Sequence, residues 1–81
     1  MNKKDKFEEE ILDYIAKFFN MNKKDINQNT KINDFSNWDS IAHVNIILGL
    51  EKKYKVKIPA KKYFELESIK KIIKFLNEKN S

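Results

Sequence analysis

The sequence predicts an all-α domain, and two observations support this expectation. Apolar residues recur at helical spacing in three segments that are separated by polar stretches. The 81 residues also include only one glycine and one proline, which disfavours a fold with many tight turns. The length fits one domain, taken here as residues 1–81. We therefore expect a bundle of three main helices and one short helix, with a long loop after the first helix.

The first helix is expected over residues 4–19. Its apolar positions form one stripe, made of Phe7, Ile11, Tyr14, Ile15 and Phe18. A connection rich in asparagine follows over residues 20–39, where such residues favour turns and caps. A few large apolar residues interrupt this loop, and we expect them to anchor it against the core: Ile26, Ile32, Phe35 and Trp38.

The second helix is expected over residues 40–54, with Asp39 or Ser40 as its N-cap. Gly49 lies inside this helix at a cost of about 1 kcal/mol relative to alanine, which raises the question of close packing there. The face predicted for this helix consists of Val44, Ile47, Leu48, Glu51 and Tyr54, with Leu50 adding to its apolar side.

The remaining chain predicts a connector and two further helices. Residues 55–59 are expected to be extended, and Pro59 suits the start of a short helix over residues 60–63. The last helix is expected over residues 68–78. Its core-facing positions are Ile69, Ile72, Ile73 and Leu76, with Phe75 at the edge.

Composition excludes several chemistries. The chain has no cysteine, so it can form no disulfide, thiolate metal site or cysteine nucleophile. No group of acidic residues and histidine has metal-ligand spacing, and one glycine cannot build a glycine-rich phosphate loop. No apolar run approaches the roughly 20 residues that span a bilayer. The charged first ten residues do not resemble a signal peptide, so we expect a cytoplasmic protein without membrane insertion.

The charge is unevenly distributed along the chain. Residues 1–40 contain seven lysines and eight acids, for a net charge of −1, whereas residues 41–81 contain ten lysines and four acids, for +6. A basic half can indicate nucleic-acid binding. Arginine, the usual residue for bidentate contacts with bases and phosphates, is absent, which weakens that interpretation.

Trp38-Asp39-Ser40-Ile41 is the most informative segment for function. It places a serine hydroxyl at the start of a helix, after an irregular polar stretch. No base is positioned to activate the hydroxyl, so the site suits attachment of a group better than catalysis. A helix N-terminus also offers unpaired backbone N–H groups and a partial positive charge.

With this segment, the chain resembles the acyl carrier proteins from about Phe7 to Leu76. The matching features are Asp39-Ser40-Ile41, then Val44, Ile46-Ile47-Leu48, Leu50-Glu51, Tyr54, Val56-Lys57-Ile58-Pro59, Phe64-Glu65 and Ser68-Ile69. The resemblance implies that Ser40 carries a covalent 4′-phosphopantetheine, added from coenzyme A by a separate transferase. The thiol of this arm would hold an acyl group as a thioester. The chain itself would not be an enzyme.

Two departures from the family pattern point to a specialised carrier. Asn37 and Trp38 stand where a glycine commonly precedes Asp-Ser, and we expect Asn37 to replace that glycine by accepting a left-handed backbone. The Trp-Asp-Ser form is similar to D-alanyl carriers and to carriers of biosynthetic clusters. The second helix is also basic, where typical members are acidic. We expect partner recognition by Asp39, Ile41 and Val44, with dedicated partners.

The resemblance implies a monomer that works with three kinds of partner. These are a phosphopantetheinyl transferase, an acyl or aminoacyl ligase, and an acyl-using transferase or synthase. One alternative keeps the fold but changes the cargo, giving an aminoacyl or peptidyl carrier. A second is a small basic helical protein that binds nucleic acid. A third is a carrier-like interaction domain without a cofactor, which the intact Asp39-Ser40 pair disfavours.

We expect structural roles for the histidine and the three tyrosines. We expect His43 to be exposed in the first turn of its helix and incidental to function. The tyrosines Tyr14, Tyr54 and Tyr63 are expected to be partly buried. Whether an acyl chain enters the bundle would depend on how loosely Ile47, Leu50 and Ile73 pack.

Overall fold

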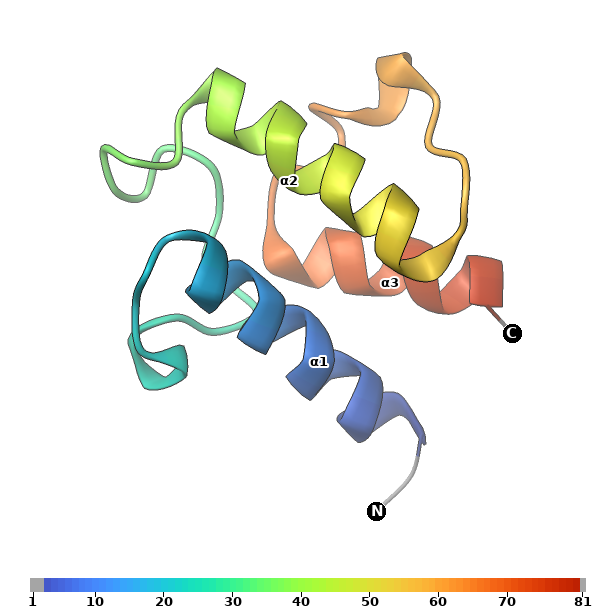
Figure 1. The fold of residues 1–81 in the computed structure, drawn as a ribbon, viewed down its shortest axis with the longest axis horizontal. Coiled ribbons are helices and arrows are strands. Elements are labelled where there is room, and N and C mark those ends of the chain that lie inside the picture. Colours follow the sequence, from blue (N-terminus) through green and yellow to red (C-terminus); the bar gives the residue numbers. More distant parts are fainter. Residues whose placement is uncertain (1–2, 81) are drawn as a thin grey trace.

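The computed structural model describes residues 3–80, and three α-helices dominate it. The helices are α1 (Lys3–Phe18), α2 (Ser40–Tyr54) and α3 (Ile69–Asn80), with short 3₁₀ turns η1 (Lys23–Asp25) and η2 (Ala60–Lys62) (Figure 1). Extended backbone pairs within this range in one isolated bridge, between Lys31 and Ser68. The all-α expectation is confirmed. The expected short helix is a 3₁₀ turn, and η1 was not predicted.

The three helices bury one apolar core. The buried side chains are Ile11, Leu12, Ile15, Ala16, Ile26, Trp38, Ile46, Ile47, Leu50, Ile58, Leu66, Ile69, Ile72, Ile73 and Leu76. The face predicted for α3 is confirmed, with Phe75 partly buried at its edge. In α1 the prediction needs a correction, because Phe18 is 40% exposed. Leu12 and Ala16 complete the buried stripe instead.

The buried face of α2 is shifted from the predicted one. It consists of His43, Ile46, Ile47 and Leu50, which follow helical spacing. Leu48 lies on the opposite side and is 43% exposed, and Val44 is half-buried. The prediction is confirmed for Ile47 and Leu50, but it was displaced around the helix because it included the apolar Leu48 and left out the polar His43.

Gly49 of α2 faces the side chain of Tyr14 on α1. A Cβ atom at this position would overlap the hydroxyl of Tyr14, which reaches across from α1. Only a residue without a side chain lets Tyr14 lie against the α2 backbone in this way. Close packing therefore accounts for a helix-disfavouring glycine in the middle of α2.

The loop between α1 and α2 is held to the core as expected. Trp38 and Ile26 are buried, and Ile32 and Phe35 are partly buried. The rings of Phe19, Phe35 and Trp38 pack together, with centroids 4.9–6.0 Å apart. Two backbone bonds of 2.9 Å, from Ile32 N to Glu67 O and from Ile69 N to Thr30 O, join the loop to the start of α3.

A connector that is neither helix nor strand leads from α2 to η2, and the expectation of extended backbone over residues 55–59 is wrong at Lys55. Lys55 ends α2 in a left-handed conformation, with φ 54°, and Pro59 directly precedes η2. The side chain of Glu51 reaches across, and its Oε2 accepts the N–H of Ile58 at 2.6 Å. This bond fixes the connector beside α2 and uses the only carboxylate of that helix.

Candidate attachment site at the start of helix α2

Ser40 is the first residue of α2, and it is exposed. Asp39 precedes it in an extended conformation, and its Oδ1 accepts the N–H of Ala42 at 2.9 Å. Asp39 is therefore the N-cap, a role that the sequence left open between Asp39 and Ser40. Since Asp39 caps the helix, capping does not require the Ser40 hydroxyl, which is available at the surface.

The backbone at this helix start favours a negatively charged substituent. The N–H of Ala42 is occupied by Asp39, and the N–H of His43 donates to the Asp39 carbonyl at 2.9 Å. The N–H groups of Ser40 and Ile41 precede the first intrahelical bond and face the end of the helix, where the dipole is positive. A phosphodiester on Ser40 would lie at this end.

The polar stretch before Ser40 is a compact turn rather than a free loop. The N–H of Asn33 donates to the Trp38 carbonyl at 2.9 Å, and the N–H of Trp38 donates to the Phe35 carbonyl at 3.0 Å. Asn33 has the left-handed conformation here, with φ 72°. The expectation for Asn37 was wrong, because Asn37 is not among the residues with positive φ. Asn33, four residues earlier, has the left-handed conformation that we expected of Asn37.

His43 is fully buried, which corrects the expectation that it is exposed. Its Nδ1 accepts the indole N–H of Trp38 at 3.0 Å, and its Nε2 lies 2.7 Å from the Tyr63 carbonyl. Because Trp38 can only donate, Nδ1 must be unprotonated and Nε2 must carry the hydrogen. His43 therefore joins three segments: the loop before Ser40, the first turn of α2, and the residues after η2.

The environment of His43 keeps the ring neutral. Burial has the largest effect and lowers the pKa of His43 from its usual value, while the backbone of Tyr63 and Leu66 and the charge of Glu67 act in the opposite direction. Protonation of Nδ1 would set two hydrogen-bond donors against each other. The spacing of His43 from Ile46 and Leu50, three and seven residues later, was a signal for burial that sequence reasoning missed.

Several apolar side chains belong to the first turns of α2 or pack against them. Ile41 is 74% exposed, and Val44 is half-buried one turn along the helix. Phe64 is 52% exposed, and its ring packs on that of His43 with centroids 5.5 Å apart. Asp39, Ser40, Ile41 and Val44 are thus adjacent at one end of α2. Phe64, from the segment after η2, contacts the first turn of α2 through His43, and it was not predicted as a site residue.

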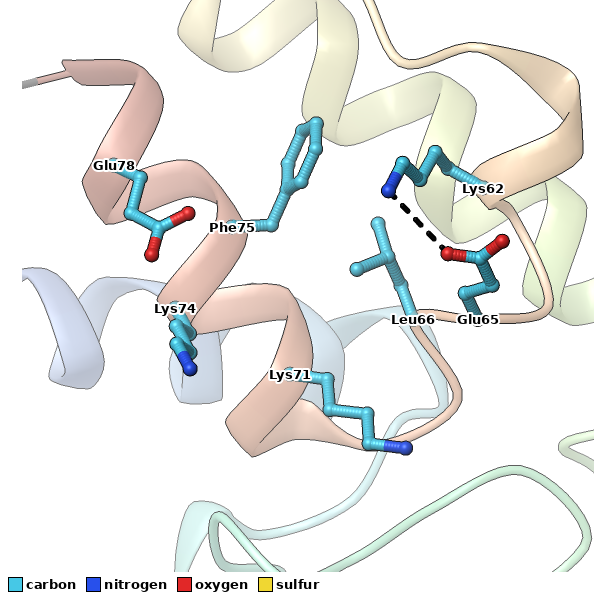
Figure 2. Close-up of a pocket in the computed structure, with 7 residues that line it drawn as sticks. All are labelled: Lys62, Glu65, Leu66, Lys71, Lys74, Phe75 and Glu78. Atoms are coloured by element: carbon cyan, nitrogen blue, oxygen red, sulfur yellow. Dashed lines mark ion pairs between the residues drawn. The ribbon is translucent and has the colours of Figure 1, made fainter.

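Two surface grooves flank α3, and Ser40 lines neither of them. The groove in Figure 2 has a volume of about 200 Å³ and lies between α3 and the residues after η2. Leu66 and Phe75 supply its apolar surface, and Lys62 pairs with Glu65 at its rim at 3.4 Å. A second groove of about 360 Å³ includes Glu8 and Ile73. Ile47 and Leu50 line neither groove, because both are fully buried in the core.

Residues 3–80 are the described part of the chain. No three acidic or histidine side chains among them are grouped so that they could hold a metal ion. None of the described helices combines the length and apolar character needed to cross a membrane. The three tyrosines are partly buried, as expected, and the Tyr54 hydroxyl donates to Glu10 at 3.0 Å.

Comparison with known proteins shows the class to which this fold and site belong. Residues 9–76 match the family model described as "Phosphopantetheine attachment site". The chain therefore belongs to this family, whose domains carry covalent 4′-phosphopantetheine, and it is a carrier protein rather than an enzyme.

Similar curated proteins agree with the family match. Proteins named "Acyl carrier protein" from Rickettsia massiliae, Rickettsia africae and Rickettsia prowazekii are each 24% identical to this chain over 81 residues. Each comparison covers 100% of this chain and 94% of the relative. The resemblance noted in the sequence is confirmed at the level of the family.

Proposed function

We propose that Ser40 is the attachment residue and that the chain carries an acyl intermediate as a thioester on its phosphopantetheine arm. The observation that supports this most directly is the exposed serine at the start of α2, with Asp39 acting as the cap in its place. Ser40 also lies within the part of the chain that matches the family model.

In this proposal the chain supplies the Ser40 hydroxyl as the nucleophile and then holds the attached phosphopantetheine arm. A transferase would remove the Ser40 proton, the serine oxygen would attack the β-phosphorus of coenzyme A, and 3′,5′-adenosine diphosphate would leave. The phosphodiester that remains on Ser40 would lie at the positive end of α2. The arm supplies the thiol that this cysteine-free chain lacks.

The partners that we propose follow from this chemistry. They are a phosphopantetheinyl transferase, a ligase that loads the arm, and a transferase or synthase that uses the cargo. Asp39, Ile41 and Val44 are proposed as recognition residues because they adjoin Ser40 at the same end of α2. A single domain over residues 1–81, a monomeric state and a cytoplasmic location stay predictions.

Intact mass measurement tests the attachment. The chain is incubated with coenzyme A and a broad-specificity transferase, beside the variants Ser40→Ala and Ser36→Ala. Ser36 is an exposed serine of the preceding loop and serves as a matched control. We expect one phosphopantetheine group on the wild type and on Ser36→Ala, and none on Ser40→Ala. Modification of Ser40→Ala would contradict the proposal.

The nature of the cargo needs a separate experiment, because the loading enzyme selects it. The phosphopantetheinylated chain is offered to acyl ligases with fatty or short acyl substrates, and to adenylating ligases with amino acids such as D-alanine. Acyl loading without aminoacyl loading is the expected result. Loading by aminoacyl ligases alone would establish an aminoacyl or peptidyl carrier of the same fold.

A further inference from the structure

One polar side chain is buried among apolar ones, and it belongs to the first turn of the helix that starts at Ser40. Of the buried side chains within residues 7–79, His43 is the only polar one. A buried imidazole needs hydrogen-bond partners for its ring nitrogens, a requirement that an apolar residue in the same place would not have. His43 meets this requirement through directional bonds, so it adds a definite geometry to this turn.

The hydrogen bond between Trp38 and His43 spans Ser40 along the chain. The indole N–H of Trp38, two residues before Ser40, donates at 3.0 Å to Nδ1 of His43, three residues after it. Two other bonds in this span belong to the helix start itself. Asp39 accepts the N–H of Ala42 with its carboxylate and the N–H of His43 with its carbonyl. Bonds of this kind occur at capped helix starts in general. The bond from Trp38 additionally fixes the residue from which the chain enters the helix.

Each polar group of Trp38 has a partner. Its backbone N–H donates to the Phe35 carbonyl at 3.0 Å, and its carbonyl accepts the N–H of Asn33 at 2.9 Å. The indole is fully buried, and its ring packs with those of Phe19 and Phe35. Since an indole N–H can only donate, loss of its acceptor would leave a buried donor without a partner. The ring, and with it the turn of residues 33–38, would then have to move.

The second ring nitrogen fixes the orientation of His43 itself. Nε2 lies 2.7 Å from the Tyr63 carbonyl, to which it donates. The rings of Trp38 and Phe64 pack on the imidazole, with centroids 5.9 and 5.5 Å from its own. The ring cannot turn over without losing the bond to Tyr63, so Nδ1 stays directed at Trp38.

We propose that His43 is a positioning residue for Ser40: by holding Trp38, it fixes the turn before the serine and with it the position of the serine oxygen in front of a transferase. The buried ring acts through Trp38 and not by contact with the reacting atoms. The serine oxygen must approach the phosphorus in line with the bond that breaks, so a small displacement of the helix start slows the transfer step. This inference rests on the proposed function, because it concerns transfer to Ser40.

Single-turnover kinetics provide the test. The chain is mixed with coenzyme A and an excess of a broad-specificity transferase. The maximal rate then reports the transfer step, and the half-saturating enzyme concentration reports binding. We expect His43→Leu, which is apolar and has no acceptor, to lower the maximal rate about 10-fold and to change the half-saturating concentration by less than about threefold. Trp38→Phe removes the donor at the other end of the bond and should have the same effect.

Two further variants separate positioning from stability. His43→Asn offers an amide oxygen as the acceptor, and we expect it to recover at least about half of the wild-type rate. Leu76→Val deletes one buried methylene in the second half of α3, which lies at the other end of the fold from the start of α2 (Figure 1). It should lower stability but keep the wild-type rate. Circular dichroism and urea denaturation measure the folding and stability of all four variants.

The indole N–H of Trp38 gives a spectroscopic signature of the bond. The chain has one tryptophan, so its nuclear magnetic resonance spectrum contains a single indole N–H signal, which a hydrogen bond shifts downfield. We expect this signal to move upfield in His43→Leu and to stay near its wild-type position in His43→Asn and Leu76→Val. The maximal transfer rate should be lost in the variants that lose the bond and kept in those that retain it.

The possible outcomes separate this inference from the proposed function. Wild-type rates in His43→Leu and Trp38→Phe, or a change only in the half-saturating concentration, would show that the bond does not position Ser40. An equal loss of rate in Leu76→Val would assign the effect to stability and also overturn the inference. If His43→Leu does not fold, Trp38→Phe decides. In each of these cases the carrier function stands, because Ser40 is still modified. If the wild type is not modified, the proposed function fails and the inference fails with it.

Discussion

The indole N–H of Trp38 donates a hydrogen bond of 3.0 Å to Nδ1 of His43, and both side chains are fully buried. Trp38 is two residues before Ser40 and His43 is three residues after it. The bond therefore closes a short bridge across the candidate attachment site. Through Nε2, the same ring contacts the Tyr63 carbonyl at 2.7 Å, so the bridge extends to the segment that carries Phe64.

Replacing His43 by alanine should destabilise the fold. The change removes a buried ring and leaves the Trp38 N–H and the Tyr63 carbonyl without their partner. We expect a loss of about 2–4 kcal/mol in the free energy of unfolding, measured by urea denaturation. Asn45→Ala, at an exposed position of the same helix, is the control and should change stability by less than about 0.5 kcal/mol. Equal stabilities of the two variants would contradict a structural role for His43.

Stability should decrease on acidification because His43 is neutral in the folded chain. Burial lowers its folded pKa, so below the usual value of 6.5 the unfolded chain binds a proton that the folded chain does not. Its contribution is complete above pH 6.5. It is lost as the pH falls toward the folded pKa, by up to about 1.4 kcal/mol per pH unit. Urea denaturation between about pH 5 and 7.5 measures this change.

The variant His43→Gln separates this titration from that of the carboxylates. Glutamine does not titrate, so its free energy of unfolding should be flatter than that of the wild type between about pH 5.5 and 7. The Lys71 side chain lowers the pKa of Glu67, which confines the effect of that carboxylate to lower pH. Identical pH profiles for the two proteins would rule out His43 as the source.

Gly49→Ala should destabilise the wild type although alanine favours helices. The new methyl group would overlap the Tyr14 hydroxyl, and displacing this half-buried ring disturbs the contact between α1 and α2. In the background Tyr14→Ala the overlap disappears, so Gly49→Ala should stabilise the helix by about 1 kcal/mol. A double-mutant cycle in urea measures this change of sign. The same effect of Gly49→Ala in both backgrounds would show that Tyr14 is not the reason for glycine.

Asp39 should contribute to stability through its cap and to transfer through its charge. Asp39→Ala removes the acceptor for the Ala42 N–H, and we expect a loss of about 1 kcal/mol in the free energy of unfolding. Asp39→Asn keeps an acceptor oxygen and should retain most of that stability. If Asp39 is also a recognition residue, Asp39→Asn lowers kcat/KM for phosphopantetheine transfer while the fold remains intact. Wild-type kinetics for Asp39→Asn would limit Asp39 to the role of a cap.

The apolar periodicity of the chain was sufficient to predict the helices and most of the core. Ile69, Ile72, Ile73 and Leu76 were assigned correctly because their spacing is that of one helical face. The face of α2 was misplaced, since its core position His43 is polar and its exposed position Leu48 is apolar. Apolar periodicity identifies a buried face only when the buried residues are also the apolar ones. The hydrogen-bond partners of His43 are Trp38 and Tyr63, and the sequence does not show that their segments are adjacent to it.

Only part of the candidate site could be predicted, because only part of it is local in sequence. Asp39, Ser40, Ile41 and Val44 are local in sequence, so helix geometry alone brings them together. Phe64 comes from 20 residues beyond Val44, and its place depends on the bond between His43 and Tyr63. In the turn before Ser40 the left-handed residue is Asn33 rather than Asn37, because the turn closes through a bond from Asn33 to the Trp38 carbonyl.

Fragmentation mass spectrometry can locate the modified residue and so test whether Ser40 holds the phosphopantetheine arm. The wild-type chain, treated with coenzyme A and a transferase, is digested and the peptide that carries the arm is sequenced. We expect a single modified residue, Ser40, with Ser36 in the same peptide unmodified. An arm on Ser36, on Ser68 or on no residue would contradict it.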